Sequence, residues 1–235
     1  MKKILIALAA LAAFTSCNFV KVNGNSLSSI IGKVNIYDAS DNYVTKSYEV
    51  ADFEGINCSI PCCELIYTAG DTRVTVDGPD NVLDSLEIST EDGILNIKQG
   101  KSHFRKVKHI DVYVSSNVLR SLDVRGAVDF KALNGIAGVG AFSIGITGAS
   151  DLEIRGIVAD NINVHATGAA DAVISGIECK QIGVVINGAG DCTLSGKAEV
   201  ANLTVNGAGD LDIRGLVATE VRSQIYGAGN IAKNK

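Results

Sequence analysis

The chain has 235 residues, of which 46% are hydrophobic, with 25 glycines, two prolines and no tryptophan. This length supports one large or two small domains with a sizeable core, and the hydrophobic content excludes a disordered chain. The formal net charge of −5 and the absence of a basic stripe argue against a nucleic-acid-binding protein. Many glycines among small polar residues are typical of a β-rich fold with tight turns.

The first 16 residues are predicted to be a signal peptide. Two lysines precede the apolar run 4–14, which is too short to span a bilayer as a stable anchor. The end of this run, Phe14-Thr-Ser-Cys17, resembles the lipobox of bacterial lipoproteins, in which the cysteine is acylated and becomes the first residue. An ordinary secretory signal is the alternative, but Cys17 falls where the apolar run should end. We therefore expect an exported outer-membrane lipoprotein that contacts the membrane through lipid on Cys17.

Residues 17–46 are rich in Ser, Asn and Asp and are predicted to be a tether with weak local structure. Removal of residues 1–16 changes the formal net charge from −5 to −7, because it takes away two lysines and no acids. The residues after Cys17 lack an acidic cluster of the kind that resembles a surface-export signal in some bacterial lipoproteins. The periplasmic face is therefore preferred, and the cell surface stays open as the alternative.

The region from residue 47 to about 120 is predicted to be an irregular set of short strands that covers the first turn of the repeat described below. Turn residues at 78–81 and 92–93 divide it. The strand candidates are 47–50, 55–60, 64–68, 73–77, 85–89, 94–98 and 109–115.

Three of the five cysteines that remain beside Cys17 cluster as Cys58-Ser-Ile-Pro-Cys62-Cys63. Export permits disulfides, but an odd number leaves at least one thiol unpaired. A soft-metal site is disfavoured because the cluster lacks CxxC spacing and a nearby histidine. A disulfide from Cys58 to Cys62 or Cys63 is the stronger alternative, and buried free thiols are favoured over both.

A glycine-acid phrase recurs through the second half of the chain, from about residue 120 to residue 235. Its last residue advances by 22, 20, 20, 19 and 20 positions. Such self-similarity at a fixed period indicates a repeat architecture. The copies are Gly126-Ala-Val-Asp129, Gly148-Ala-Ser-Asp151, Gly168-Ala-Ala-Asp171, Gly188-Ala-Gly-Asp191, Gly207-Ala-Gly-Asp210 and Gly227-Ala-Gly-Asn230.

Alternating segments follow and precede each phrase, as in Leu152-Glu-Ile-Arg-Gly156 and Ile162-Asn-Val-His-Ala166. Alternation with period two indicates strands with one buried face. Two or three such strands per 20 residues predict an all-β, single-stranded β-solenoid with turns about 4.8 Å apart. A β-sandwich of hairpins is the alternative, but it would not force so constant a step. The expected inward ladders are Phe130, Leu152, Ala172, Cys192, Leu211 and Ile231, and then Ile154, Ile174, Leu194 and Ile213.

An ordered set of segments resembles a known family. These are Tyr48-Glu-Val-Ala-Asp-Phe53-Glu-Gly-Ile56, then Val74-Thr-Val-Asp-Gly78-Pro-Asp-Asn81, then Asp92-Gly-Ile-Leu-Asn-Ile97, followed by the Gly-Ala-Gly-Asp turns. The succession resembles the putative auto-transporter adhesin head GIN domain, common in lipoproteins of Bacteroides-like bacteria. The resemblance covers about residues 45–235, and the domain is placed at 47–235. It implies a right-handed β-helix, export to the envelope and no catalytic residues.

The acids of the phrase form the Asp ladder, which consists of Asp129, Asp151, Asp171, Asp191 and Asp210. The last four resemble the acids of calcium-binding solenoid repeats, but the phrase comes only once per turn and a second loop of ligands is missing. The preferred interpretation is that each carboxylate accepts hydrogen bonds from turn N–H groups. Asn230 fits it, because a neutral amide makes the same bond.

The corner glycines are expected to be structural rather than a phosphate cradle, because no P-loop or strand-GxGxxG-helix context exists. They permit backbone angles or close stacking that a side chain would block. These residues are Gly148, Gly168, Gly188, Gly207 and Gly227.

Catalytic residues are not expected. Polysaccharide-active β-helices need a compact acid and base set. The outward pairs Glu153/Arg155 and Asp212/Arg214 lie about three turns apart, and His103, His109 and His165 are scattered. The prediction is a non-enzymatic, lipid-anchored envelope protein without a cofactor, an adhesin-like or interaction module with a protein or glycan partner. A Ca²⁺-stabilised or carbohydrate-binding solenoid is the alternative, and a polysaccharide-active enzyme is less favoured.

Overall fold

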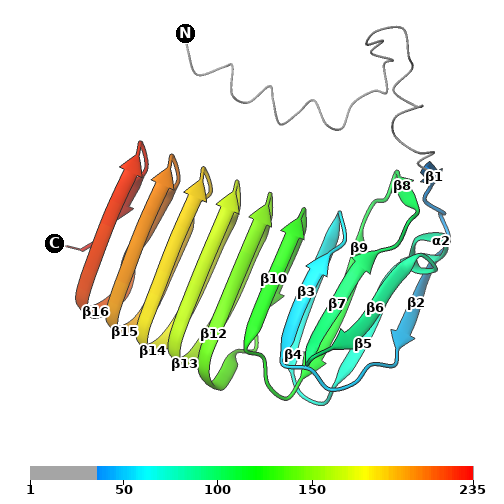
Figure 1. The fold of residues 1–235 in the computed structure, drawn as a ribbon, viewed down its shortest axis with the longest axis horizontal. Coiled ribbons are helices and arrows are strands. Elements are labelled where there is room, and N and C mark those ends of the chain that lie inside the picture. Colours follow the sequence, from blue (N-terminus) through cyan, green and yellow to red (C-terminus); the bar gives the residue numbers. More distant parts are fainter. Residues whose placement is uncertain (1–35, 235) are drawn as a thin grey trace, which may run out of the picture. The chain divides into compact units, whose positions relative to one another are not determined.

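The computed structural model describes residues 36–234, apart from the side chains of 137–139, and these residues form an almost entirely β fold (Figure 1). Cys17 and the predicted signal peptide lie outside the described residues. Across the described part, no helix has the length and apolar character needed to cross a membrane.

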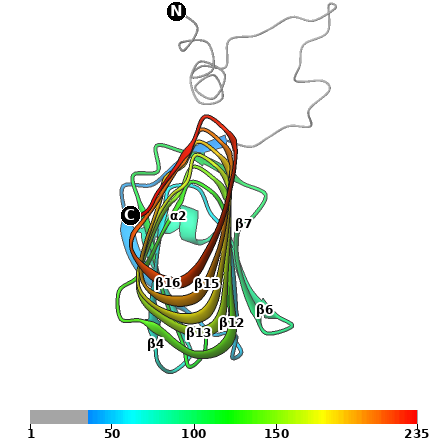
Figure 2. The same ribbon diagram turned by 90° about the vertical axis from the view of Figure 1, so that its left-hand side faces the viewer.

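Five long strands from the repeat stack in parallel, each in register with the next. Their order in the stack follows the sequence, and a short strand, β17 (Asn230–Ala232), pairs with the beginning of the last one. Viewed along the stack, the turns superpose as a flattened loop (Figure 2). The five strands are β12 (Ile136–Gly148), β13 (Asp151–Gly168), β14 (Asp171–Gly188), β15 (Cys192–Gly207) and β16 (Asp210–Gly227).

Each turn contributes to two faces. The residues that follow a glycine-acid phrase, such as 151–155, form the first face, and those that precede the next phrase, such as 161–168, form the second face. Burial alternates along both, so every second side chain enters the core.

The first predicted inward ladder is confirmed, and the second is confirmed from Ile154 to Leu194. Phe130 pairs with Leu152, Leu152 with Ala172, and the series continues through Cys192 and Leu211 to Ile231. All but the half-buried Ile231 are at most 4% exposed. The second ladder is in direct register from Ile154 to Leu194. At Ile213 the pairing of β15 with β16 shifts register, although the Ile213 side chain stays buried.

Departures from the 20-residue step are absorbed away from the glycine-acid corners. In the step of 22, two extra residues fall between 133 and 138, where the pairing of β12 with β13 shifts. In the step of 19, the shift lies between Ile174 and Ile177, opposite the Ser195-Gly196 corner. The ladders on either side therefore keep their register.

The stack extends into the first half of the chain, but not in sequence order. β3 (Gly55–Ser59) and β4 (Cys63–Ala69) form a turn that pairs on one side with β10 (Ser121–Gly126) and β11 (Val128–Ala132). On the other side it pairs with β7 (Ile94–Gln99) and β9 (Ile110–Ser116), also in parallel. The chain must therefore cross the β3–β4 turn between β9 and β10. At this crossing, Arg120 forms an ion pair with Glu54 at 2.6 Å.

Antiparallel strands cover the outer side of the β7–β9 turn. β5 (Arg73–Pro79) pairs with β9 and with β2 (Tyr43–Tyr48), and β6 (Leu86–Glu91) forms a hairpin with β7 through Asp92-Gly93. The short helix α2 (Asp80–Leu83) buries Val82 and Leu83 at this end. These elements are the irregular region expected from the sequence.

Residues 36–46 contain defined strands, although their composition predicts a tether. β1 (Ile36–Asp38) pairs with β8 (His103–Arg105), and β2 begins at Tyr43. Asp38 forms ion pairs with Arg105 and Lys106. The hydrogen bond from Lys106 lowers the pKa of the Asp38 carboxyl most, and the hydrogen bond from Arg105 lowers it further. Long-range pairing thus orders a segment whose own sequence carries a weak strand signal.

Candidate functional site

The glycine-acid phrases stack into one continuous corner of the solenoid. From Ala149 onward, the N–H of the alanine in the phrase donates to the carbonyl of the corner glycine one turn below, as Ala189 does to Gly168 at 2.9 Å and Ala208 to Gly188 at 2.8 Å. At Gly207, φ is +138° and a Cβ would lie 2.1 Å from the Gly188 oxygen. Close stacking of backbone on backbone therefore requires glycine here.

The Asp ladder lies beside these glycines on the outside of the corner. The backbone N–H of Asp191 donates to the Asp171 carboxylate at 2.8 Å, and that of Asp210 donates to Asp191 at 2.9 Å. Asp151 donates to Asp129 in the same way at 3.2 Å. The donor belongs to the next turn rather than to the acid's own turn, so these carboxylates tie successive turns together.

A shallow groove of about 410 Å³ runs along the start of the Asp ladder. It is lined by Asp129, Asp151, Asp171 and Glu153, together with Lys131, whose ammonium forms an ion pair with Glu64 at 2.5 Å. Within residues 36–234 no group of three or more His, Cys, Asp or Glu side chains is arranged to hold a metal ion. Among the acids of the groove, Asp129 and Asp171 accept hydrogen bonds from backbone N–H groups, and Glu153 forms an ion pair with Arg155.

Cys58 and Cys63 meet inside the corner between β3 and β4. Both are buried and both are free thiols. The hydrogen bond between them lowers the pKa of Cys58 and raises that of Cys63. Cys62 is exposed, with a φ of +57°.

The other two cysteines of the described part are also free thiols. Cys192 occupies the core ladder, where burial raises its pKa to about 12. Cys179 is half-buried on a different part of its turn.

The titratable residues weighed as catalytic candidates do not converge. The pairs Glu153–Arg155 and Asp212–Arg214 each close an ion pair at 2.6 Å on separate turns. Hydrogen bonding to Arg214 lowers the pKa of Asp212 to about 2. His165 contacts Asn187 at 3.1 Å, His109 stacks on Tyr43, and His103 lies on β8.

Acid-x-Arg pairs recur along the outward faces. Asp123–Arg125 and Glu220–Arg222 form the same type of pair, each at 2.7 Å. The repeated spacing of an acid two residues before an arginine is the sequence signal for them. Residues two apart in a strand share one face, which explains the contact.

The second face carries an outward ladder of small polar side chains near the corner. Its members are Thr147, Thr167, Asn187 and Asn206, and the Asn206 amide donates to Asn187 at 2.7 Å. At the same position in the last turn stands Tyr226, which is 62% exposed. This face presents a regular polar surface along the stack.

Known structures share the fold at low sequence identity. A putative adhesin from Bacteroides fragilis matches with a TM-score of 0.70 and 20% identity, over 84% of this chain and 100% of that one. A putative adhesin from Parabacteroides distasonis matches with a TM-score of 0.64 and 16% identity, over 85% and 100%. A putative lipid binding protein from the same species gives 0.54 and 16%, over 86% and 100%.

None of the curated proteins compared with the chain matches it. A family model matches residues 52–234, and it covers the β3–β4 turn, the crossing and the whole repeat. The chain therefore belongs to the family described as putative auto-transporter adhesin, head GIN domain.

Proposed function

We propose that this protein is a non-enzymatic, lipid-anchored adhesin-like protein of the cell envelope that presents its solenoid as a contact surface. The observation that carries the proposal is the regular, outward polar surface that the in-register turns hold along the stack. Family membership supports an exported envelope protein, and the similar structures described as adhesins support a binding role. A rigid strand scaffold keeps such a surface organised without a ligand.

The anchor is the first part to test, because Cys17 lies outside the described residues. A fatty-acid label should appear on the wild-type chain, and Cys17→Ala should abolish both the label and membrane retention. Cys62→Ala is the matched control, since this thiol is exposed but is no lipidation candidate. Unchanged labelling of Cys17→Ala would disprove the anchor.

The binding role is tested on cells. A deletion strain is complemented with the wild type or with Asn187→Lys/Asn206→Lys, which places charges on the second face, and adhesion to host and bacterial cells is counted. Val173→Lys is the control, because this exposed residue lies on the first face. Loss of adhesion with the double variant alone supports the proposal.

Two results would overturn it. If added protease leaves the chain fully intact on whole cells, the chain is not exposed at the cell surface. That result would rule out a role in adhesion to other cells. If the protein cleaves a polysaccharide, and Glu153→Gln or Asp212→Asn abolishes that activity, the protein is an enzyme.

A further inference from the structure

The last turn of the solenoid leaves core positions open to solvent. Val221 stacks on Ala201 and Ile225 on Val205, and both of the covered residues are 0% exposed. Val221 and Ile225 themselves are 37% and 44% exposed. The same two stacking positions are thus buried in β15 and exposed to solvent in β16.

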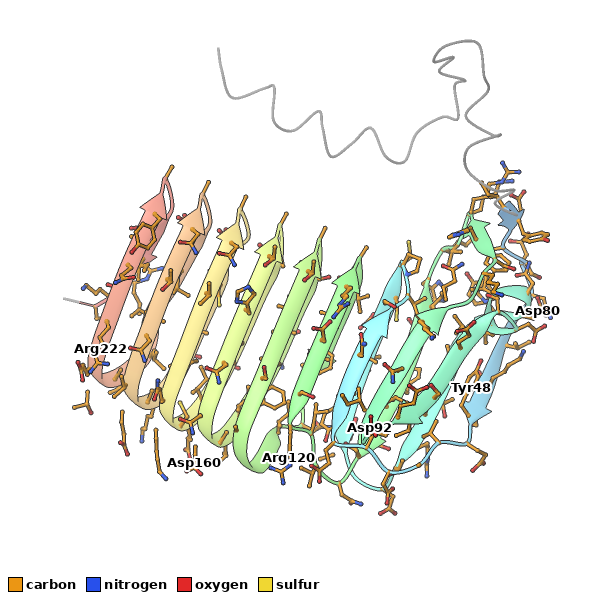
Figure 3. All side chains as sticks on the ribbon, in the orientation of Figure 1. Tyr48, Asp80, Asp92, Arg120, Asp160 and Arg222 are labelled. Carbon is orange, nitrogen blue, oxygen red and sulfur yellow. The ribbon has the colours of Figure 1, made fainter. Side chains whose placement is uncertain are left out.

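The backbone edge of this turn is open as well. β17 pairs only with Asp210–Asp212, and the side chain of Asn234 donates to the Arg214 carbonyl at 2.7 Å. These contacts cover the first face. Across the described residues, no strand pairs with the outer edge of 220–226, which we call the terminal edge. Figure 3 labels Arg222 on this edge. Unpaired strand edges are templates for pairing with another chain.

The opposite end of the stack differs from the terminal edge, because its core is covered. There the core is closed by antiparallel strands and by α2, and Val74, Val76, Val82 and Leu83 are at most 2% exposed. That end therefore has no bare core positions to match Val221 and Ile225. Two copies that meet through the same terminal edge are related by a two-fold axis and form a closed dimer.

The sequence of the terminal edge is self-complementary about Ser223. In antiparallel pairing centred there, Val221 of one copy lies opposite Ile225 of the other, and this contact occurs twice on the core side. Outward, Glu220 faces the hydroxyl of Tyr226, and Arg222 faces the amide of Gln224, so that donors meet acceptors. The two copies of Arg222 lie diagonally, and each is already paired with its own Glu220 at 2.7 Å.

We propose that the terminal edge binds a second copy of this chain, so that two solenoids join end to end into one continuous β-sheet with a shared core. This inference goes beyond the adhesin-like role and does not depend on it. A covered edge and two pairs of buried aliphatic side chains would stabilise the dimer through backbone hydrogen bonds and the hydrophobic effect.

Cross-linking tests the register. Opposite residues in an antiparallel pair have Cα atoms roughly 4.5–5.5 Å apart, within the range that a disulfide spans. In a Cys62→Ser background of the full chain, purified in detergent, Ser223→Cys should form a covalent dimer on mild oxidation. Ser143→Cys, an exposed serine in the middle of the stack, is the matched control and should stay monomeric. Equal cross-linking of both variants would overturn the proposal.

Sedimentation tests the interface. Ile225→Glu should weaken self-association at least about tenfold, since it places a charge in the apolar contact. The side chain is exposed in the single chain, so folding should persist, as a cooperative melt would verify. Val158→Glu, on an exposed valine three turns away, should leave the dimer intact. A wild type that is monomeric at every concentration, a dimer that survives Ile225→Glu, or cross-linking of Ser223→Cys to a different protein would each refute the second-copy interface.

Discussion

Single residues of the corner are fixed by backbone contacts rather than by a ligand. Gly207 sits at a φ that disfavours side chains, with a carbonyl oxygen where its Cβ would be. Asp191 accepts one backbone hydrogen bond from the turn above. The constraint on Gly207 is steric, so any added side chain should be unfavourable there. The constraint on Asp191 is the need for a hydrogen-bond acceptor, so a residue that keeps an acceptor oxygen should be tolerated.

Gly207→Ala should destabilise the fold by about 2 kcal/mol or more, because the added Cβ meets the Gly188 oxygen and φ is unfavourable. Urea unfolding measures the difference. Gly140→Ala is the control, since its Cβ would meet only the Asp160 carboxylate at 3.9 Å. Equal effects of both substitutions would contradict close stacking as the cause.

Asp191→Asn should be nearly silent, because an amide oxygen can accept the same bond from Asp210. Asp191→Leu removes the acceptor and should cost about 1 kcal/mol of unfolding free energy. Thermal melts of both variants, with Ca²⁺ and with chelator, provide the measurement. A large loss with Asn, or a melting temperature that rises with Ca²⁺, would favour a metal at the Asp ladder.

Cys192 should make stability depend on pH in alkaline solution. Burial raises its pKa from 9.0 to about 12, so the folded state retains a proton that the unfolded chain releases. Its contribution is complete below pH 9 and falls by about 1.4 kcal/mol per pH unit as the pH rises toward 12. Cys192→Ala, which copies its ladder neighbour Ala172, should reduce that slope in urea titrations. Identical slopes would mean that the thiol is accessible to base.

At the scale of elements, the turn is the unit of stability. Each long strand contacts mainly the turns before and after it, and the register across β13, β14 and β15 is nearly unbroken. Stability of such arrays is close to a sum of turn and interface contributions. The register shifts between β12 and β13 and between β14 and β15 fall between ladders, and Ile213, where a third shift meets the second ladder, stays buried.

Deletion of residues 171–190 should therefore give a shorter protein that still folds. In the deletion, Asp191 would follow Ala170. Leu152 and Cys192, which in the wild type both stack on Ala172, would then stack directly on each other. Deletion of 171–180 is the control, because half a turn puts second-face residues where first-face residues are needed. Circular dichroism and melting should separate the two, and a folded half-turn deletion would contradict in-register stacking.

For the described part as a whole, the two ends of the stack differ. One end is sealed by β2, β5, β6 and α2, and the other exposes the terminal edge. Ile36, where the described chain begins, belongs to β1, which pairs with β8 in the first half of the chain. The covered middle turns have partners on both sides, and the second face of the last turn has one.

Hydrogen exchange should reveal this asymmetry. Amides of β13 and β14 should exchange slowest, because both of their edges are paired. Peptides from 220–226 should exchange faster in dilute protein and become protected as the concentration rises and the dimer forms. In Ile225→Glu that concentration dependence should vanish. Protection of 220–226 at every dilution would indicate a different cover for the terminal edge.

The repeat, its ladders and the glycine corners could be predicted from the sequence, because period-two alternation and a 20-residue step are local, translational signals. Phe130, Leu152 and Ala172 align by counting alone. The strands of the first half were also recognisable, with β3, β5 and β7 close to their expected bounds. Their order was not, since the segments of β3, β7 and β9 all have the pattern of short strands and nothing local specifies which pairs with which.

The sequence by itself therefore determined the β-solenoid class, the inward faces and the corner residues. Only the tertiary structure decided that β7–β9 lies outside β3–β4, that the Asp ladder bonds between turns, and that Val221 and Ile225 are bare. The physical reason is that burial of a side chain along one strand follows from its own pattern. Strand order and the exposure of an end depend instead on which distant segment supplies the next edge.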